Sequence, residues 1–183
     1  MYKILLLGPQ GSGKGTQAER LSQRLGIPTL SMGQLLRDVI AEEGILADRI
    51  RETVHAGGLV SDDIAITILD RKIQELGAKD GYILDGFPRN EAQLKAYDAY
   101  DHPTHVVVIE IPRDISLDRI AHRSRVERRV DDTPEVIAYR LDVYEQESIP
   151  MLAYYEPRGI VRRVDGMGTV DEVEQRIKDA VGV

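Results

Sequence analysis

The chain has 183 residues, a length that favours one domain with small insertions over two full domains. It contains no cysteine, which excludes disulfides and thiolate metal sites, and its net charge of −7 argues against a general nucleic-acid binder, since such proteins need a basic face. The first apolar run, residues 4–7, is far too short for a signal peptide or a membrane span. We expect a cytoplasmic monomer without nucleic-acid or membrane partners, in which residues 1–183 form a single domain.

Short apolar runs alternate with longer helical patterns along the chain. Four runs bounded by Gly, Pro, Asp or His are typical of buried parallel strands: residues 4–7, 82–84, 106–109 and 159–161. Helix signals lie between and after them, at residues 15–25, 31–43, 61–76, 133–155 and 170–181. Strands that alternate with helices predict βαβ units, so the expected fold class is α/β, with three layers and helices on both faces of a parallel sheet.

Two stretches depart from this alternation. Residues 31–60 look helical throughout, with no strand between them, and we expect a small helical insert there. Residues 124–133 are rich in charge and have no apolar periodicity, which predicts a loop between two helices. Loops of this kind often act as lids over a binding site.

A glycine-rich loop, residues 8–16, follows the first strand and opens the first helix. Glycines let the backbone wrap a phosphate with its N–H groups, and the N-terminus of a helix adds positive potential. Lys14 can then reach the outer phosphates of a nucleotide as a point charge. The strict pattern has Ser or Thr directly after the lysine, whereas here Gly15 intervenes and Thr16 follows. A merely structural glycine-rich turn is the alternative, but the strand–loop–helix context favours a P-loop.

The second strand ends at Asp85, and Arg89 follows in the same loop. An acid at the carboxyl end of a buried strand, next to a phosphate loop, is placed to hold Mg²⁺ through its water shell. An ordinary turn or helix-capping aspartate is the alternative. The planar fork of an arginine on this loop can bridge phosphates.

Further arginines surround the charged loop of this otherwise acidic chain. Arg119 and Arg123 are one helical turn apart, Arg129 lies in the loop, and Arg140 lies on the next helix. Phosphoryl transfer needs cations that neutralise the transferring group, and one such arginine can contribute ~10³–10⁵ in rate. Surface salt bridges with neighbouring carboxylates would explain any one of these arginines, but they do not account for the whole set.

With these motifs the chain resembles the adenylate kinases over essentially its whole length. The matching segments are residues 8–17, 31–37, 57–60, 85–89 with Gln93, 119–123, 129–132, Arg140 and 155–159. So many ordered motifs at compatible spacing are highly specific. The resemblance is to the short-lid type, because the chain lacks the longer insert and the four-ligand metal site of some members. No structural zinc is therefore expected.

The resemblance implies ATP, AMP and ADP as substrates, Mg²⁺ as cofactor, the insert at 31–60 as the monophosphate-binding part, and residues 124–133 as a short lid. It implies that ATP is bound by Gly11, Ser12, Gly13, Lys14, Gly15, Thr16, Arg119 and Arg123. It implies that AMP is bound by Met32, Arg37, Leu59, Val60, Gly86, Arg89, Gln93, Arg129 and Arg140. The catalytic residues would be Lys14, Arg89, Arg123, Arg129 and Arg140, with Mg²⁺ near Asp85 and Thr16 through water.

Three positions leave the acceptor base open. The family usually has a small residue like Thr or Ser where Met32 stands, and Asp or Glu where Gln34 stands. Asn90 resembles the UMP and CMP kinases, so a pyrimidine-monophosphate kinase is an alternative reaction.

A nucleotide-binding module without catalysis is a second alternative, disfavoured because the charged residues that catalysis needs are all present. These residues are Lys14, Asp85, Arg89, Arg123 and Arg140. A GTP-dependent switch is disfavoured because the sequence has no Asn-Lys-x-Asp tetrapeptide to read guanine.

Overall fold

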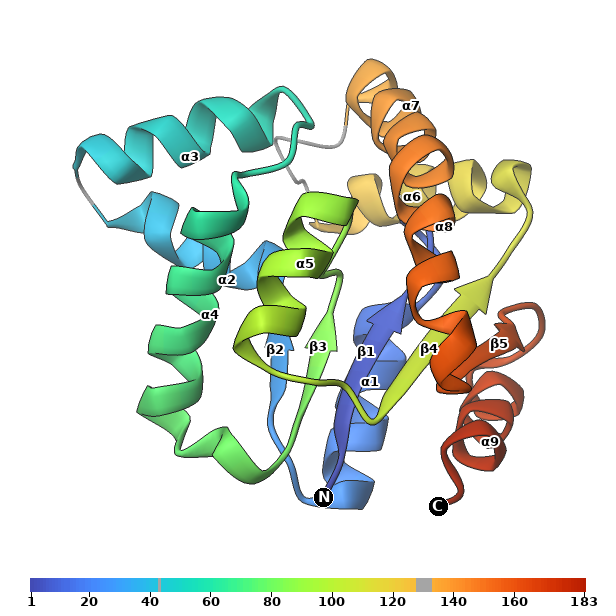
Figure 1. The fold of residues 1–183 in the computed structure, drawn as a ribbon. Helices are drawn as coiled ribbons and strands as arrows, with labels where there is room; N and C mark the ends of the chain where they lie inside the picture. Colours follow the sequence, from blue (N-terminus) through green and yellow to red (C-terminus); the bar gives the residue numbers. More distant parts are fainter. Residues whose placement is uncertain (43, 128–132) are drawn as a thin grey trace.

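The computed structural model describes residues 1–42, 44–127 and 133–183, of which 123–127 are described by their backbone alone. A five-stranded parallel sheet lies at its centre, in the strand order β2-β3-β1-β4-β5 (Figure 1). The strands are β1 (Lys3–Leu7), β2 (Thr29–Ser31), β3 (Tyr82–Asp85), β4 (His105–Glu110) and β5 (Val161–Asp165). Because β1 stands between β3 and β4, the loops that follow these three strands meet at one edge of the sheet.

Helices cover both faces of this sheet. In the described residues they are α1 (Lys14–Leu25), α2 (Met32–Ala41), α3 (Ile45–His55), α4 (Asp62–Leu76), α5 (Glu91–Tyr100), α6 (Arg113–Glu127), α7 (Pro134–Val143), α8 (Ile149–Met151) and α9 (Val170–Val181). A π-helical turn, Tyr144–Ser148, joins α7 to α8, and 3-10 turns lie at Ala78–Asp80, Leu152–Tyr154 and Glu156–Arg158. Within the described ranges, no helix has both the length and the apolar character that crossing a membrane requires.

The side chains of β1 show why helices are needed on both faces. Alternate residues of a strand point to opposite sides of the sheet. Ile4 is buried in one apolar cluster with Ala18 of α1 and Ile177 of α9, whereas Leu5 is buried in a second cluster to which α4, α5 and α8 contribute. The strand is therefore apolar on both sides, as parallel strands in α/β proteins are. The three-layer α/β fold predicted from the sequence is confirmed.

The range 31–60, predicted to be a helical insert, contains α2 and α3, and these two helices pack against each other. In Figure 1 the C-terminal end of α3 lies next to α7. A hydrogen bond joins them there, since the guanidinium of Arg140 in α7 donates to the carbonyl oxygen of Val54 at 3.1 Å. The insert is thus in contact with the arm that carries Arg140. That it binds a monophosphate stays a prediction at this point.

Two strands differ from the sequence prediction. No strand is predicted between residues 25 and 31, yet β2 pairs with β3 over Thr29–Ser31. With three residues and a single buried side chain, Leu30, this strand has no apolar run to reveal it. The last strand begins at Val161 rather than at Gly159, because Gly159 ends a 3-10 turn in the left-handed conformation, with φ of 65°.

Two helical segments also differ from the prediction. The helix expected over residues 133–155 is interrupted by the π-helical turn after α7, and Pro150 lacks the N–H that would continue an α-helix. The loop is expected from residue 124, whereas α6 continues to Glu127, with no Gly or Pro to stop it before that residue. The rest of the predicted lid, residues 128–132, lies outside the described residues.

One ion pair fixes α5 against the segment that follows α8. Both guanidinium N–H₂ groups of Arg158 donate to the carboxylate of Asp98 at 2.7 Å, and the hydroxyl of Tyr154 donates to it at 2.7 Å. The Arg158 guanidinium also lies 4.7 Å from the centre of the Tyr154 ring. Hydrogen bonding from Arg158 holds the pKa of Asp98 well below its usual range. The ionised form of Asp98 is therefore the one that stabilises the fold.

Replacing this carboxylate by an amide should lower stability in a pH-dependent way. We expect Asp98→Asn to lower Tm at pH 7 by about 2–8 °C, from a loss of about 1–2 kcal/mol. The folded-state pKa lies below the unfolded value of about 3.9, so the stabilisation is complete above that pH and declines as the pH falls towards the folded pKa. Thermal unfolding of both proteins between pH 7 and pH 2.5 checks this. Equal Tm values at pH 7, or a gap that does not narrow in acid, would contradict it.

Candidate active site

The functional edge of the sheet is built from the loops after β1 and β3. Leu6 of β1 is in register with Asp85 at the end of β3, so the glycine-rich loop begins beside this carboxylate. Ligands of open α/β sheets bind in the crevice outside the carboxyl ends of the strands. The geometry therefore brings the P-loop motif, Asp85 and the loop that carries Arg89 to the expected ligand position.

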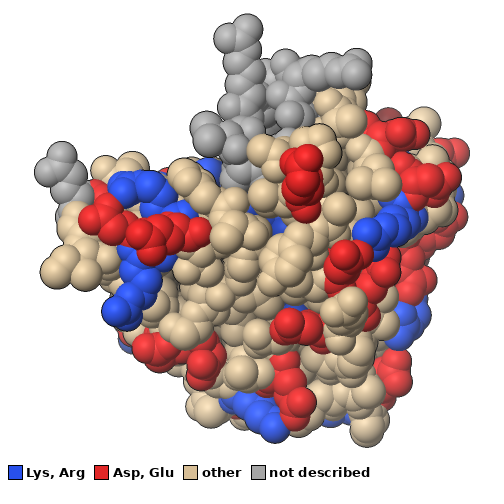
Figure 2. All heavy atoms as spheres, turned by 90° about the horizontal axis from the view of Figure 1, so that it is seen from above, with Lys and Arg blue, Asp and Glu red and all other residues tan. Residues whose placement is uncertain are grey.

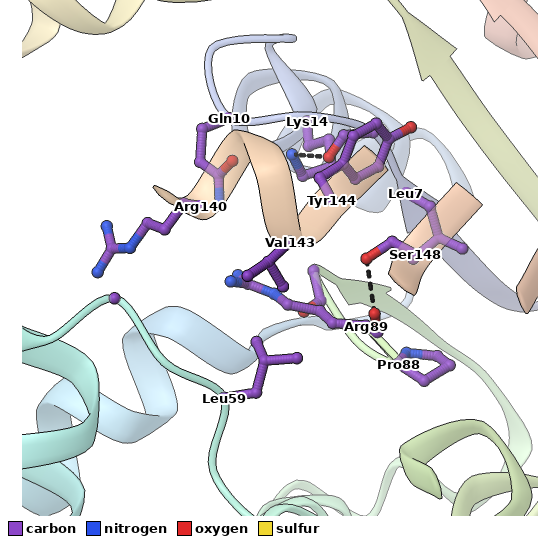
Figure 3. A pocket seen from close by; sticks show the side chains of 13 residues that line it. Leu7, Gln10, Lys14, Leu59, Pro88, Arg89, Arg140, Val143, Tyr144 and Ser148 are labelled. Atoms are coloured by element: carbon purple, nitrogen blue, oxygen red, sulfur yellow. Dashed lines mark hydrogen bonds between the residues drawn. The ribbon is translucent and has the colours of Figure 1, made fainter. Parts of the chain in front are cut away.

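A pocket opens between these loops and the helical arm formed by α7 and the π-helical turn (Figure 3). The pocket is open to solvent, so a ligand can reach its lining. Its lining comprises Leu7, Gly8, Gln10, Lys14, Gly57, Leu59, Gly86, Pro88, Arg89, Arg140, Val143, Tyr144 and Ser148. Three side chains of this set are cationic and none is acidic. Among the residues that the structure describes, the lining is thus that of an anion site.

The acidic surface around the pocket contrasts with this lining. Figure 2 shows acidic side chains at many points around the rim of the face seen from above, interspersed with basic ones. The described part of that face carries no continuous basic patch, which agrees with the net charge of −7. The three cations of the pocket are therefore a local feature of a surface of mixed charge, which fits a small phosphorylated ligand better than a large polyanion.

The glycine-rich loop is held in a shape that only glycine permits at two positions. Gly8 and Gly11 have φ of 148° and 78°, and a Cβ added to them would lie 2.5 Å from the carbonyl oxygen of Ile109 and 2.8 Å from that of Ser116. The Ser116 hydroxyl also donates to the carbonyl of Gln10. Helix α6 therefore presses directly on the loop and fixes its path.

Lys14 stands at the start of α1 with its ammonium group over the loop. It donates to the carbonyl oxygens of Gly8 and Pro9, both at 2.8 Å (Figure 3). The guanidinium of Arg119 reaches the same loop from α6, at 3.4 Å from the carbonyl oxygen of Gly11. Two cations thus lie against the backbone that the motif predicts to wrap a phosphate.

Arg89 is fixed by three hydrogen bonds that involve three different segments. Its Nε–H donates to the carbonyl of Gly86 at 2.7 Å, its backbone N–H donates to the side-chain oxygen of Gln93 at 2.9 Å, and its carbonyl accepts from the hydroxyl of Ser148 at 2.6 Å. The terminal nitrogens of its fork have no hydrogen-bond acceptor among the described residues. This arginine is therefore oriented by the protein while its fork stays available to a ligand.

Charge repulsion and burial both act on Arg89. Burial lowers its pKa most, the positive charge of Arg140 lowers it further, and Asp85 acts in the opposite direction. An arginine remains charged despite such a shift, because its intrinsic pKa is so high. An anion between Arg89 and Arg140 would relieve this repulsion, so the pair favours a ligand with at least one negative charge.

Asp85 fits the hydrated cation that the sequence predicts. Its Oδ1 atom is buried and has no hydrogen-bond partner, and buried carboxylate oxygens normally have one. Thr16, the other residue predicted near the cation, is an exposed residue on the first turn of α1. Across the described residues, no group of three or more His, Asp or Glu side chains is placed to hold a metal ion. A cation at Asp85 would thus depend on water and phosphate oxygens for most of its ligands.

The comparison with known proteins assigns this site to a family. The sequence model described as "Adenylate kinase" matches residues 6–160. The chain belongs to the adenylate kinase family.

Individual adenylate kinases match over nearly their full length. That of Xylella fastidiosa (strain M12) is 43% identical, over 98% of this chain and 99% of the relative. Those of Stenotrophomonas maltophilia (strain R551-3) and Thermus thermophilus are each 42% identical, over 98% of this chain and 98% and 97% of the relative. The resemblance noted in the sequence is confirmed, and with it the enzyme class: adenylate kinases are nucleoside-monophosphate kinases, a group of phosphotransferases.

The structure brings part of the predicted adenylate kinase site into one pocket. Lys14, Leu59, Gly86, Arg89 and Arg140 all line it. The other predicted phosphate-loop residues, Gly11, Ser12, Gly13, Gly15 and Thr16, continue the loop and the first turn of α1 beside the pocket without lining it. The side chain of Arg123 and all of Arg129 lie outside the described residues, so their roles stay predictions.

The predicted AMP residues divide between the pocket and the insert. Gln93 is buried at the start of α5, and its side-chain N–H₂ group donates to the carbonyl of Val60 at 2.9 Å. Met32 is buried at the start of α2. Arg37, also on α2, donates to the side-chain oxygen of Gln34 at 2.8 Å. A second hollow lies between α3 and α4 and includes Leu59 and Val60 in its lining.

Sequence reasoning missed several residues of the pocket. The sequence indicates no role for Gln10 beyond its place in the loop, yet its side chain lines the pocket and its Oε1 atom is buried without a hydrogen-bond partner. Tyr144 and Ser148 enter from the π-helical turn, where the sequence predicts an unbroken helix. Burial raises the pKa of Tyr144 to about 12, so this hydroxyl stays protonated at neutral pH. Pro150 was the one available signal, since it marks an irregular helix.

The close approach of α6 to the loop can be tested with a matched pair of glycines. Gly11→Ala forces a Cβ against the carbonyl of Ser116, whereas Gly26→Ala imposes a similar left-handed strain, with φ of 66°, in open space. We expect Gly26→Ala to cost about 1–2 kcal/mol of stability without loss of turnover. Gly11→Ala should cost more and should also reduce kcat at least about tenfold, because the loop shifts. Thermal unfolding and steady-state kinetics check both, and equal effects in the two variants would contradict the account.

Proposed function

We propose that the chain catalyses the reversible transfer of a phosphoryl group from ATP to AMP, giving two ADP, and so maintains the balance of adenine nucleotides. The observation that carries this proposal is the convergence of Lys14, Arg89 and Arg140 in one pocket beside a P-loop, in a member of the adenylate kinase family. Such a pocket suits two phosphorylated ligands that meet end to end. Lys14 would face the donor phosphates and Arg89 the acceptor phosphate.

ATP and AMP would enter from opposite sides of the pocket. On the donor side, the N–H groups of the loop and of the first turn of α1 would cradle the phosphates, with Arg119 beside them. On the acceptor side, the terminal nitrogens of the Arg89 fork would bind the AMP phosphate bidentately, with Arg37 as a second cation. The base of AMP would lie near Leu59, Val60 and Met32. Arg123, Arg129 and Arg140 would close on the phosphates between the two sides.

Catalysis in such a site rests on positioning and on electrostatic stabilisation. Transfer between two bound nucleotides converts a bimolecular step into one within a single complex. The charge that spreads over the transferring group would be met by Lys14, Arg89 and Arg140, which the fold already holds near one another, so little reorganisation is needed. The mechanism needs no covalent intermediate and no dedicated strong base.

Mg²⁺ is proposed as the cofactor that accompanies ATP. Asp85 would hold it through its water shell, with Thr16 on the neighbouring turn, because the buried oxygen of Asp85 lacks a partner. When bound, the ion neutralises phosphate charge and orients the phosphate chain. A zinc site is not part of this proposal. The expectations of a cytoplasmic monomer without nucleic-acid or membrane partners remain predictions.

Water must be kept from the transferring group, or ATP would be hydrolysed. The contact between Arg140 and Val54 already brings the predicted monophosphate insert against α7. The predicted short lid would complete the enclosure on the ATP side, and this part of the proposal rests on the family resemblance.

Removing the ammonium group of Lys14 should abolish most of the rate. We expect Lys14→Met to lower kcat at saturating ATP and AMP by at least about 10²-fold, because its charge stabilises the transferring group more than it binds ground-state ATP. Lys79→Met, at an exposed lysine far from the loop in the sequence, is the control and should leave kcat unchanged. A coupled assay for ADP, with circular dichroism to verify the fold, makes the comparison. Near-normal turnover of Lys14→Met would refute the assigned role.

The acceptor base should be adenine. The side-chain oxygen of Gln93 accepts one hydrogen bond, from the backbone of Arg89, and its N–H₂ group donates one, to Val60. One acceptor position and one N–H therefore remain for a base. This remaining pair can bind the N1 and N6 edge of adenine, and the expectation of adenine rather than a pyrimidine rests on the family to which the chain belongs. We expect AMP to be preferred over UMP and CMP by at least about tenfold in kcat/KM, which needs only ~1.4 kcal/mol. Steady-state kinetics with ATP as donor decide it, and equal values for CMP or UMP would indicate a pyrimidine-monophosphate kinase instead.

A further inference from the structure

The helical arm between α7 and α8 contains a π-helical turn, Tyr144–Ser148, followed closely by Pro150. The N–H of Ile149 donates to the carbonyl of Tyr144, five residues earlier, so the turn is wider than an α-helical one. Pro150 has no N–H to give to the carbonyl four residues before it, which removes the α-helical alternative at that point. Turns of this kind are rare and frequently lie at functional sites.

The wider turn keeps one row of side chains directed at the pocket. Arg140, Tyr144 and Ser148 are spaced by four residues, and all three line it (Figure 3). In a regular α-helix each step of four residues rotates the side chain by about 40° beyond a full turn. A π-helical turn rotates less per residue and offsets part of this drift. Ser148 therefore faces the same pocket as Arg140, two turns away along one helical arm.

Ser148 uses its hydroxyl on the loop that carries Arg89. The side chain is 6% exposed, and its O–H donates to the carbonyl oxygen of Arg89 at 2.6 Å. A helical serine commonly bonds a carbonyl of its own helix, four residues earlier. Here that carbonyl, on Tyr144, already accepts from Ile149, and the hydroxyl crosses to a segment 59 residues away in sequence.

This bond completes the fixation of the Arg89 backbone. The N–H of Arg89 donates to Gln93, so the peptide groups on both sides of its Cα are held, one by α5 and one by the π-helical turn. The direction of the side chain follows from these two peptide planes. Arg89 is close enough to Arg140 for the two charges to repel, so a loosened Arg89 would be expected to turn away.

We propose that Ser148 is a positioning residue for phosphoryl transfer: its hydroxyl fixes the Arg89 backbone and so directs the Arg89 fork at the acceptor phosphate. The inference rests on the proposed function, in which Arg89 binds that phosphate. The α7–α8 arm then contributes to the pocket in two ways, because it supplies Arg140 and sets the direction of Arg89. Ser148 acts through Arg89 and not on the reacting atoms.

A matched pair of substitutions isolates the hydroxyl. Thr and Val have nearly the same shape, but only Thr keeps an O–H group. We expect Ser148→Val to lower kcat/KM for AMP by about tenfold or more, since small displacements of a positioned group have large effects on rate. Ser148→Thr should stay within about threefold of wild type, and KM for ATP should change less than about twofold in both. If Ser148→Val does not fold, Ser148→Ala takes its place.

A double-mutant cycle then tests whether the effect passes through Arg89. In an Arg89→Lys background, Ser148→Val should have little further effect, because the group that it positions is already replaced. Equal behaviour of the Thr and Val variants, or a Val effect that is the same in both backgrounds, would overturn the proposal. Wild-type transfer from ATP to AMP in the same assay reports on the proposed function separately. Calorimetric titration with AMP repeats the comparison without catalysis, so the positioning role is tested even if transfer fails.

Discussion

The arrangement of this molecule depends on holding one guanidinium, that of Arg89, in a place where neighbouring charge repels it. One hydrogen bond holds the guanidinium itself, from its Nε–H to Gly86 after β3, and two more hold the backbone of Arg89, one with Gln93 on α5 and one with Ser148 on the π-helical turn. Each partner is fixed in turn by its own element. Helix α5 is tied to the C-terminal part of the chain by the Asp98–Arg158 pair, far from the pocket. The loop after β3, α5 and the helical arm thus converge on one residue, Arg89, whose terminal guanidinium nitrogens stay open to a ligand.

Gln93 links the loop that carries Arg89 to the helical insert. Its amide oxygen accepts from the backbone N–H of Arg89, and its amide nitrogen donates to the carbonyl of Val60, the last residue of the helical insert. A ligand that contacts the insert and a ligand that contacts Arg89 would therefore act on one hydrogen-bonded unit.

The parts of this arrangement that depend on short, contiguous sequence patterns could be predicted from the sequence. The P-loop, Asp85 and Arg89 each follow a buried strand, and parallel strands bring their carboxyl ends to one edge whatever the details of packing. Strand β2 could not be predicted in this way, because it is three residues long and pairs only through tertiary contact. The same holds for Ser148. Its role depends on a π-helical turn and on a partner 59 residues away, and neither leaves a periodic signal in the sequence.

The central claim is that Arg89 is fixed before any ligand binds and then receives a phosphate. The NMR signal of its Nε–H group tests this most directly, with Arg89→Lys to identify the resonance. The account predicts a resolved signal that exchanges slowly with solvent in the free protein, because the group donates to Gly86 at 2.7 Å, and that shifts when AMP is added. A signal that exchanges rapidly in the free protein and does not respond to AMP would contradict the account.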